Sequence, residues 1–364
     1  MKINLPYDSI SKLQKLIATK DENIYSSDLF LQYLLNSERY NLAAEYQRRS
    51  ANAMSKEQLF AAMLAEKLSD KRRGKVRTLV HHLDGRCVIL NGDHYLANPF
   101  IKNIKIPEKS IGKWRFATDR YAPYQAFAYR DIEVNKGLEE KTHLGFFEVT
   151  FSFPVVMQED RVWMSITPHE IETMQQAINE AQGVVAVMGL GLGYFPFMIA
   201  QKESVKKIII FEKDKEVISL FSQHLLAQFP NKEKITIIEA DAVNDFSACV
   251  QKSNPNYVFI DVWQGVDDGL PIFVKLKMEE RIFPNTRFRY WIEKSLLAMT
   301  RRIIITILEE ALEGFTENDY QQTDIQLDNI FSDLFYKIAV VKFSNYDDIY
   351  YLLTDEGISA LLER

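Results

Sequence analysis

The sequence predicts an α/β fold in which a parallel sheet with helices on both faces follows a helical N-terminal segment and a small β-rich region. In the C-terminal half, short runs of apolar, often β-branched residues alternate with helical patterns, which is typical of parallel strands buried on both faces. Before that, apolar residues recur at helical spacing and then give way to strand-like runs. We therefore expect three parts, which are residues 1–75, 76–166 and 167–364.

The composition argues against several classes of protein. The chain has 364 residues, of which 47% are hydrophobic and 26% charged, with a net charge of −6 at pH 7. These values are ordinary for a globular protein, and the acidic balance disfavours a surface that attracts nucleic acid or an anionic membrane. Cys87 and Cys249 lie in different regions and suggest neither a disulfide framework nor a metal cluster. With no apolar stretch of membrane-spanning length and no secretory signal, we expect a cytoplasmic protein.

The N-terminal part is helical in pattern and leads into a basic connector. Residues 1–70 contain no glycine and carry apolar residues at helical spacing. We interpret Lys71–His82 as an exposed charged linker rather than a phosphate-binding segment, because the chain as a whole is acidic. His81 and His82 are interpreted as surface residues, since adjacent histidines without a third ligand are a poor metal site.

The next part shows strand and turn patterns. Cys87–Leu90 reads as a strand and Asn91–Asp93 as a tight turn after it. Ala126–Val134 and Phe146–Met157 also read as strands, and Arg161–Ile166 is expected to pair back on the latter as a hairpin. A small sheet of this kind is placed to cover a ligand cleft in the part that follows.

A helix start opens the C-terminal part. Thr167 is the expected N-cap, Pro168 occupies the first helical position, and Glu170 at the third position is expected to return a capping hydrogen bond. His169 remains as a candidate site residue within the same segment.

A strand, a glycine turn and a helix follow one another at residues 184–200. Val184–Met188 is an apolar strand pattern, the turn holds Gly189, Gly191 and Gly193, and Tyr194–Ala200 is compatible with a helix. Glycine permits φ > 0 and lets a ligand approach bare backbone, while the free N–H groups of the helix start face that ligand. The pattern therefore predicts the first βα unit of a nucleotide-binding sheet.

Three further strand patterns each deliver an acid at or just past their C-terminal end. They are Lys206–Phe211 with Glu212, Lys234–Glu239 with Asp241, and Asn256–Ile260 with Asp261. Glu212 follows Gly189 by 23 positions, close to the ~20 residues expected for a carboxylate that binds ribose hydroxyls. The third glycine stands one position earlier than in the dinucleotide fingerprint, which disfavours a pyrophosphate cradle, and no P-loop motif is present.

These motifs resemble those of class I S-adenosylmethionine-dependent methyltransferases. The resemblance covers roughly residues 167–310, and the preceding β-rich stretch makes it similar to the spermidine-synthase-like branch. It implies a Rossmann-like sheet and S-adenosyl-L-methionine as cofactor. The cofactor-binding residues that it implies are Gly189, Leu190, Gly191, Gly193, Glu212, Lys213, Asp241, Ala242 and Asp261.

The resemblance also implies individual roles. Glu212 would accept hydrogen bonds from both ribose hydroxyls, Asp241 would take the adenine amine, and the Ala242 N–H would bind a ring nitrogen. Asp261 would lie beside the sulfonium, where it could accept a proton from the acceptor or hold the acceptor in place. Trp263 is either an aromatic face near the sulfonium or a packing residue at the sheet edge.

Two departures from the family pattern leave the reaction open. Val187 stands where the family often has an acid, and the residues after Asp261 match no acceptor motif. The prediction is methyl transfer to a small molecule or a macromolecular side chain, with His169 and Trp263 as substrate-binding candidates and no metal. Alternatives are aminopropyl transfer to a polyamine and a non-catalytic cofactor-binding module. A small-molecule acceptor is favoured over nucleic acid, no membrane partner is expected, and a homodimer stays open.

The C-terminal segments are less distinct in pattern. Residues 288–312 read either as one long helix or as a helix followed by a strand at Arg302–Leu308. Tyr336–Phe343 and Asp348–Leu353 read as a terminal hairpin, which is also the antiparallel pair that the resemblance implies at the sheet edge.

Overall fold

The computed structural model describes residues 5–36, 42–49, 54–68, 83, 85–314 and 326–364. The segment Lys71–His82, with His81 and His82, lies outside these residues, so its interpretation as an exposed linker stays a prediction.

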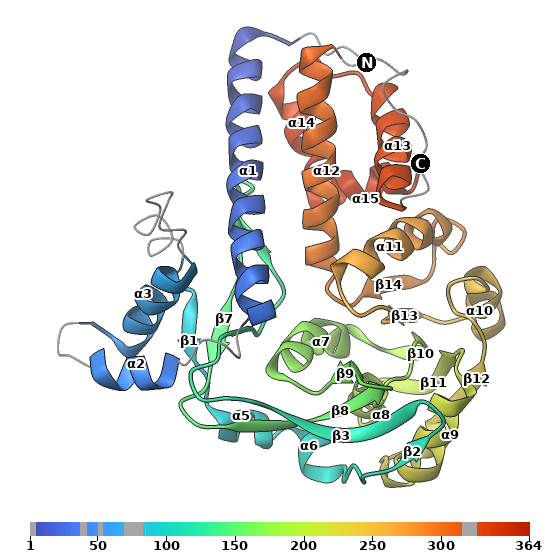
Figure 1. Ribbon diagram of the computed structural model, residues 1–364. Coiled ribbons are helices and arrows are strands. Elements are labelled where there is room, and N and C mark those ends of the chain that lie inside the picture. The colour runs from blue at the N-terminus through green and yellow to red at the C-terminus, as the bar shows by residue number, and fades with distance from the viewer. Residues whose placement is uncertain (1–4, 37–41, 50–53, 69–82, 84, 315–325) are drawn as a thin grey trace.

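The core of the described chain is a five-stranded parallel sheet (Figure 1). Its strands are β10 (Gly183–Met188), β11 (Val205–Glu212), β12 (Ile235–Glu239), β13 (Tyr257–Ile260) and β14 (Arg287–Tyr290). The order across the sheet is β12-β11-β10-β13-β14, so β10, which comes first of the five along the chain, lies in the middle. The chain extends the sheet first on one side of β10 and then on the other, and such a reversal leaves a crevice at the carboxyl ends of the two central strands.

Helices connect these parallel strands. They are α8 (Tyr194–Ala200), α9 (Lys215–His224), α10 (Phe246–Ser253) and α11 (Val266–Glu280), while α7 (Pro168–Glu180) precedes the first of the strands, β10. Parallel crossovers are almost always right-handed, so reversing the direction of sheet growth moves the connecting helices to the opposite face. In agreement, α7 packs against α8 and α10 packs against α11. The predicted α/β organisation with a parallel sheet is confirmed in this form.

A smaller antiparallel sheet lies against α9 and next to the carboxyl end of the parallel sheet. Its order is β2-β3-β8-β9, and its strands are β2 (Ser110–Ile111), β3 (Trp114–Tyr121), β8 (Phe151–Gln158) and β9 (Arg161–Ser165). The predicted hairpin is confirmed, because β8 and β9 pair antiparallel. The remaining strands of this region are β1 (Cys87–Ile89), β4 (Phe127–Ala128), β5 (Glu133–Val134), β6 (Glu140–Lys141) and β7 (Leu144–Phe146).

Some boundaries predicted for this region are wrong. The tight turn predicted at Asn91–Asp93 is the start of a helix. The Asn91 side chain accepts a hydrogen bond from the Asp93 N–H and caps helix α5 (Gly92–Leu96), which is followed by α6 (Pro99–Asn103). An asparagine serves equally well in a turn and at a helix N-cap, so the residue alone does not separate the two. The predicted strands over 126–134 and 146–157 are each broken by loops into shorter pieces.

The N-terminal part is helical, as predicted. Its helices are α1 (Tyr7–Asn36), α2 (Leu42–Arg49) and α3 (Lys56–Leu68). Helix α1 lies alongside α12 (Glu293–Glu313) and α14 (Tyr346–Leu352), so the two ends of the chain pack together (Figure 1). Among the described residues, no helix combines the length and the apolar character that crossing a membrane requires.

A buried ion pair joins α1, β6 and α12. Arg302 of α12 is paired with Glu140 of β6, whose side chain is only 4% exposed. The same guanidinium donates to the Ser27 hydroxyl in α1 at 2.6 Å. Asn23 of α1 accepts from the Glu140 N–H at 3.1 Å. The N-terminal helix is therefore fixed in position by polar contacts as well as by apolar packing.

The predicted C-terminal hairpin is wrong, because residues 336–339 end helix α13 (Gln326–Ala339) and residues 348–352 lie in helix α14, and no strand is assigned in either segment. The last elements are α12, α13, α14 and α15 (Asp355–Leu362). Asn345 and Asp348 form a capping box that starts α14, so the polar residues expected to turn a hairpin begin a helix instead. The apolar run at 303–308 lies within α12, which contacts α1, α11, α13 and α15 and is therefore buried along several sides.

Candidate functional site

A cavity of about 310 Å³ lies where the carboxyl ends of the parallel strands face the small antiparallel sheet. This volume falls at the lower end of the ~300–1,000 Å³ typical of small-molecule sites. The predicted site residues that line it are Gly189, Leu190, Gly191, Glu212, Lys213, Asp241, Ala242, Asp261 and Trp263. Gly193 and His169 are not part of its wall.

The glycine turn is required by backbone geometry at its two ends. Gly189 has φ +99°, and a Cβ at this position would lie 2.0 Å from the backbone oxygen of Asp261. Gly193 has φ +75°, and a Cβ there would lie 2.4 Å from the Phe221 ring. The first glycine thus permits the close approach of β10 and β13, whereas Gly193 permits close packing at the start of α8. Gly193 therefore supports the cavity without lining it.

The middle of the glycine turn is covered by a methionine from the small sheet. Gly191 has φ +52°, and a Cβ here would lie 2.2 Å from Sδ of Met164 in β9. The same sulfur accepts a hydrogen bond from the Leu192 N–H at 3.3 Å. Methionine is flexible and adapts to irregular spaces, so this side chain narrows the space over the turn with an adjustable group. The sequence analysis did not identify Met164.

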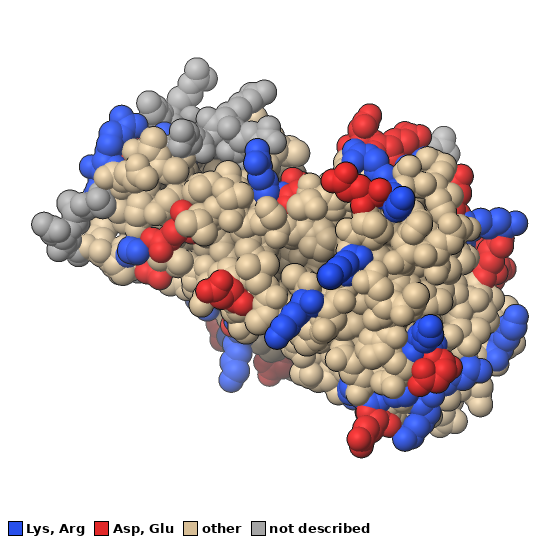
Figure 2. All heavy atoms as spheres, turned by 90° about the horizontal axis from the view of Figure 1, so that it is seen from below, with Lys and Arg blue, Asp and Glu red and all other residues tan. Residues whose placement is uncertain are grey.

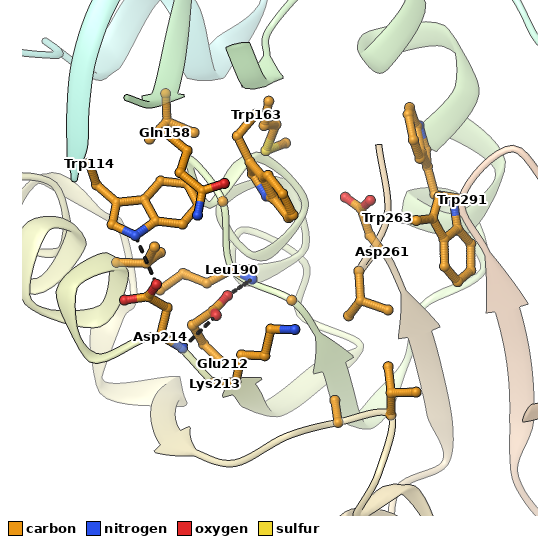
Figure 3. Close-up of a pocket in the computed structure, with 18 of the residues that line it drawn as sticks. Trp114, Gln158, Trp163, Leu190, Glu212, Lys213, Asp214, Asp261, Trp263 and Trp291 are labelled. Carbon is orange, nitrogen blue, oxygen red and sulfur yellow. Dashed lines mark hydrogen bonds between the residues drawn. The ribbon is translucent and has the colours of Figure 1, made fainter. Parts of the chain in front are cut away.

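Glu212 joins the glycine turn to the start of α9. Its carboxylate accepts from the Leu190 N–H at 3.1 Å and from the Asp214 N–H at 2.9 Å (Figure 3). Burial raises the pKa of Glu212, while these N–H donors oppose the shift. A carboxylate has about four acceptor positions, so capacity remains for donors from a ligand.

Asp241 is held by the loop that follows β12. One carboxylate oxygen accepts from the backbone N–H groups of Val243 and Asn244, each at 3.0 Å. Burial opposes the ionisation of Asp241, but these donors and the nearby Lys213 ammonium outweigh it, and the pKa of Asp241 is lowered. Asp241 therefore presents an ionised, pre-oriented acceptor at this end of the cavity.

All four tryptophans of the chain line the cavity, and they come from separate parts of the sequence. Trp114 and Trp163 lie on the side of the small sheet with their rings edge to face at 5.6 Å, and the Trp114 indole N–H donates to Asp214 at 2.9 Å. Trp263 and Trp291 lie beyond Asp261 (Figure 3). The sequence analysis singled out Trp263 alone.

The packing role predicted for Trp263 is confirmed, whereas its role near a sulfonium stays a prediction. It is only 4% exposed, and its ring stacks on Tyr290 with centroids 6.1 Å apart. The ring also lines the cavity beside Asp261. Packing against β14 therefore holds the tryptophan in place at the cavity wall.

The start of α7 contributes a carboxyl group that the sequence analysis assigned to capping. Thr167 is the N-cap, as predicted, and its hydroxyl accepts from the Glu170 N–H. The expected return bond from the Glu170 side chain is wrong: this carboxyl lines the cavity, and its Oε2 is buried without a hydrogen-bond partner. His169 lies outside the cavity wall, with its ring edge-on to Trp291 at 6.1 Å.

Glu170 and Asp261 are the most strongly perturbed acids of the cavity. Burial raises the pKa of Asp261 to about 7. Burial also raises the pKa of Glu170, and the negative charge of Asp261 raises it further. The two carboxyl groups therefore oppose each other's ionisation. In total the wall carries five carboxyl groups, including Asp214, and the ammonium groups of Lys113 and Lys213.

Comparisons of the chain with models of known protein families, with curated proteins and with solved structures found no match. A function for this protein therefore has to follow from the cavity and the residues that form it.

Proposed function

We propose that this protein binds S-adenosyl-L-methionine in the cavity and transfers its methyl group to a small-molecule acceptor, on a Rossmann-like sheet. The observation that carries the proposal is the meeting of a glycine turn with three strand-end acids in one cavity, beside the point where the strand order reverses. This is the crevice where open α/β sheets bind nucleotides.

The lining supports a nucleoside that carries positive charge. Glu212 has acceptor capacity for ribose hydroxyls, and Asp241 offers an ionised acceptor for the adenine amine. The excess of carboxyl over ammonium groups suits a sulfonium, and aromatic faces attract cations within about 6 Å of the ring. Burial between the two sheets favours transfer, because a dry, oriented site suits an electrophile that is already activated.

A small acceptor fits the charge distribution of the protein. Figure 2 shows a face on which Lys and Arg lie among Asp and Glu, with uncharged surface between them. Nucleic-acid-binding proteins instead gather basic residues into a patch or stripe. The modest volume of the cavity and its tryptophans also favour a compact acceptor over a polymer.

Calorimetry with three ligands tests the proposal. S-Adenosylmethionine and S-adenosylhomocysteine should bind with dissociation constants in the micromolar range, on the order of −8 kcal/mol. Because every tryptophan lines the cavity, intrinsic fluorescence should change on binding with the same midpoint. Tighter binding of decarboxylated S-adenosylmethionine would instead indicate aminopropyl transfer. Binding of none of the three would refute the proposal.

Glu212→Ala should weaken the binding of S-adenosylhomocysteine by about 1–3 kcal/mol, because a pair of hydroxyls would lose a charged acceptor. The matched control is Glu239→Ala. Glu239 lies opposite Glu212 on β12 and pairs with Lys215 outside the cavity. Since Glu212 also binds the Leu190 N–H, thermal unfolding of both variants must accompany the titrations. Equal affinities for the two variants would contradict the assigned position of the ribose.

A further inference from the structure

Two carboxyl groups from distant parts of the chain line the same cavity, and the charge of Asp261 acts on Glu170. Glu170 is the third residue of α7 and is only 7% exposed, and its Oε2 is buried without a partner. Asp261 directly follows β13, where its backbone N–H donates to the Met188 carbonyl at 2.9 Å. The Thr167 cap fixes the start of α7, and the strand pairing fixes Asp261. Rigid elements on both sides therefore hold the two groups together.

The groups around this pair supply little positive charge. The hydroxyls of Tyr121 and Tyr194 are close enough to Glu170 for its charge to raise their pKa values, although burial is the larger cause. Trp263 and Trp291 lie beside Asp261 (Figure 3). The basic residues of the wall belong to its other end, where Lys113 lies 3.4 Å from Asp214 and Lys213 acts on Asp241.

Neighbouring carboxyl groups in a site that supplies little positive charge oppose each other's ionisation, so one of them keeps its proton to higher pH. In such pairs one proton is held between the two groups, and they titrate as a unit. Glu170 has an oxygen without a hydrogen-bond partner, which a shared proton would satisfy.

We infer that Glu170 and Asp261 share one proton, and that their shared negative charge makes the cavity prefer the charged sulfonium cofactor over its neutral thioether product. The inference rests on the proposed function for the identity of the ligand. A sulfonium beside the pair stabilises its ionised form, so binding of the cofactor draws a proton off the pair. A thioether lacks this charge and leaves the proton in place.

The first experiment needs no ligand. Carbon-13 NMR of side-chain carboxyl groups, followed from pH 4 to pH 9, should show in the wild type one carboxyl that ionises only above neutral pH. The midpoint of this titration should move to lower pH in Glu170→Gln and in Asp261→Asn, because each change removes the neighbouring charge. The controls are Glu203→Gln and Asp267→Asn, at exposed positions away from the cavity wall. Ordinary, independent titration of both carboxyls in the wild type would overturn the shared proton.

The second experiment measures selectivity against pH. The ratio of the dissociation constant of S-adenosylhomocysteine to that of S-adenosylmethionine should rise by about tenfold or more between pH 6 and pH 9, since one pKa unit corresponds to a tenfold change. The double variant Glu170→Gln/Asp261→Asn should give a flat ratio, whereas Glu203→Gln/Asp267→Asn should retain the rise. A rise that persists in the first double variant would overturn the role of the pair.

The two experiments separate this inference from the function on which it rests. If neither nucleoside binds while the NMR titration shows the shared proton, the cofactor assignment is refuted. The shared proton of Glu170 and Asp261 is then confirmed independently of the ligand. If both nucleosides bind with a ratio that does not depend on pH, the cofactor assignment stands and the selectivity of the pair is refuted.

Discussion

Gly189→Ala should destabilise the protein by about 3 kcal/mol or more and abolish the nucleoside binding that we propose. A non-glycine residue at φ +99° is strained, which costs about 1–3 kcal/mol. The added Cβ would also lie 2.0 Å from the backbone oxygen of Asp261. A backbone atom cannot rotate away as a side chain can, so β10 and β13 would have to separate at the cavity. Urea unfolding measures the loss of stability, and calorimetry measures the loss of binding.

Gly85→Ala provides the matched control. Gly85 has φ +70°, but a Cβ there would meet nothing within 4 Å, so this variant carries the backbone strain without the steric clash. Its cost should be about 1–2 kcal/mol, the penalty of the left-handed conformation alone. The loss of stability in Gly191→Ala should lie between those of Gly85→Ala and Gly189→Ala, because the added Cβ would meet the flexible Met164 side chain. Equal destabilisation by all three variants would show that the clash at Gly189 is relieved elsewhere.

The parallel sheet was predictable because its signals are local. The four strands β10 to β13 are short apolar runs, and each has a glycine or an acid at its end or just past it. Parallel strands end at a common edge, so Glu212, Asp241 and Asp261 were expected together, and they line one cavity. Strand β14 escaped prediction because its alternation of arginine with aromatic residues, Arg287–Tyr290, lacks the apolar run of the inner strands.

The C-terminal helices were not predictable for a different reason. Short apolar runs such as 348–353 fit a strand and a buried helix equally well, and only tertiary contacts decide between them. Here α13 and α15 pack on α12, and α14 packs on α1, a partner more than 300 residues away in sequence. No local pattern contains that information.

The other half of the site depends on tertiary structure in the same way. Trp114, Trp163 and Met164 reach the cavity only because the small sheet lies over the carboxyl edge of the larger one. The position of Glu170 is compatible with helix capping and with a role in the cavity, and the capping pattern at Thr167–Glu170 favoured the first. One signal was present in the sequence: the chain has only four tryptophans, of which two lie in the predicted β-rich region and Trp263 follows the strand that ends before Asp261.

The cavity acids should lower the free energy of unfolding as pH rises, whereas ordinary ion-paired carboxylates raise it. Burial raises the pKa of Asp261 from 3.8 to about 7. The native state therefore binds more protons than the unfolded state between these values, and the free energy of unfolding falls as pH rises through this window. Below pH 4 the group is protonated in both states and carries no penalty.

Asp261→Asn should consequently be more stable than the wild type at pH 8.5 by about 2–4 kcal/mol, since each pKa unit corresponds to about 1.4 kcal/mol. The difference should shrink towards zero near pH 4. Glu170→Gln should also be more stable than the wild type at pH 8.5 and equal to it near pH 4, because either change removes the repulsion between the two acids. Burial lowers the pKa of His169 to about 4, so acid pH destabilises the wild type and both variants through this residue. Its contribution therefore cancels when the free energies of unfolding of the variants and the wild type are subtracted. The measurement is urea unfolding at half-unit steps of pH, with Asp267→Asn as the exposed control. A stabilisation that does not vary with pH would mean that the amide improves packing and that the buried charge carries no cost.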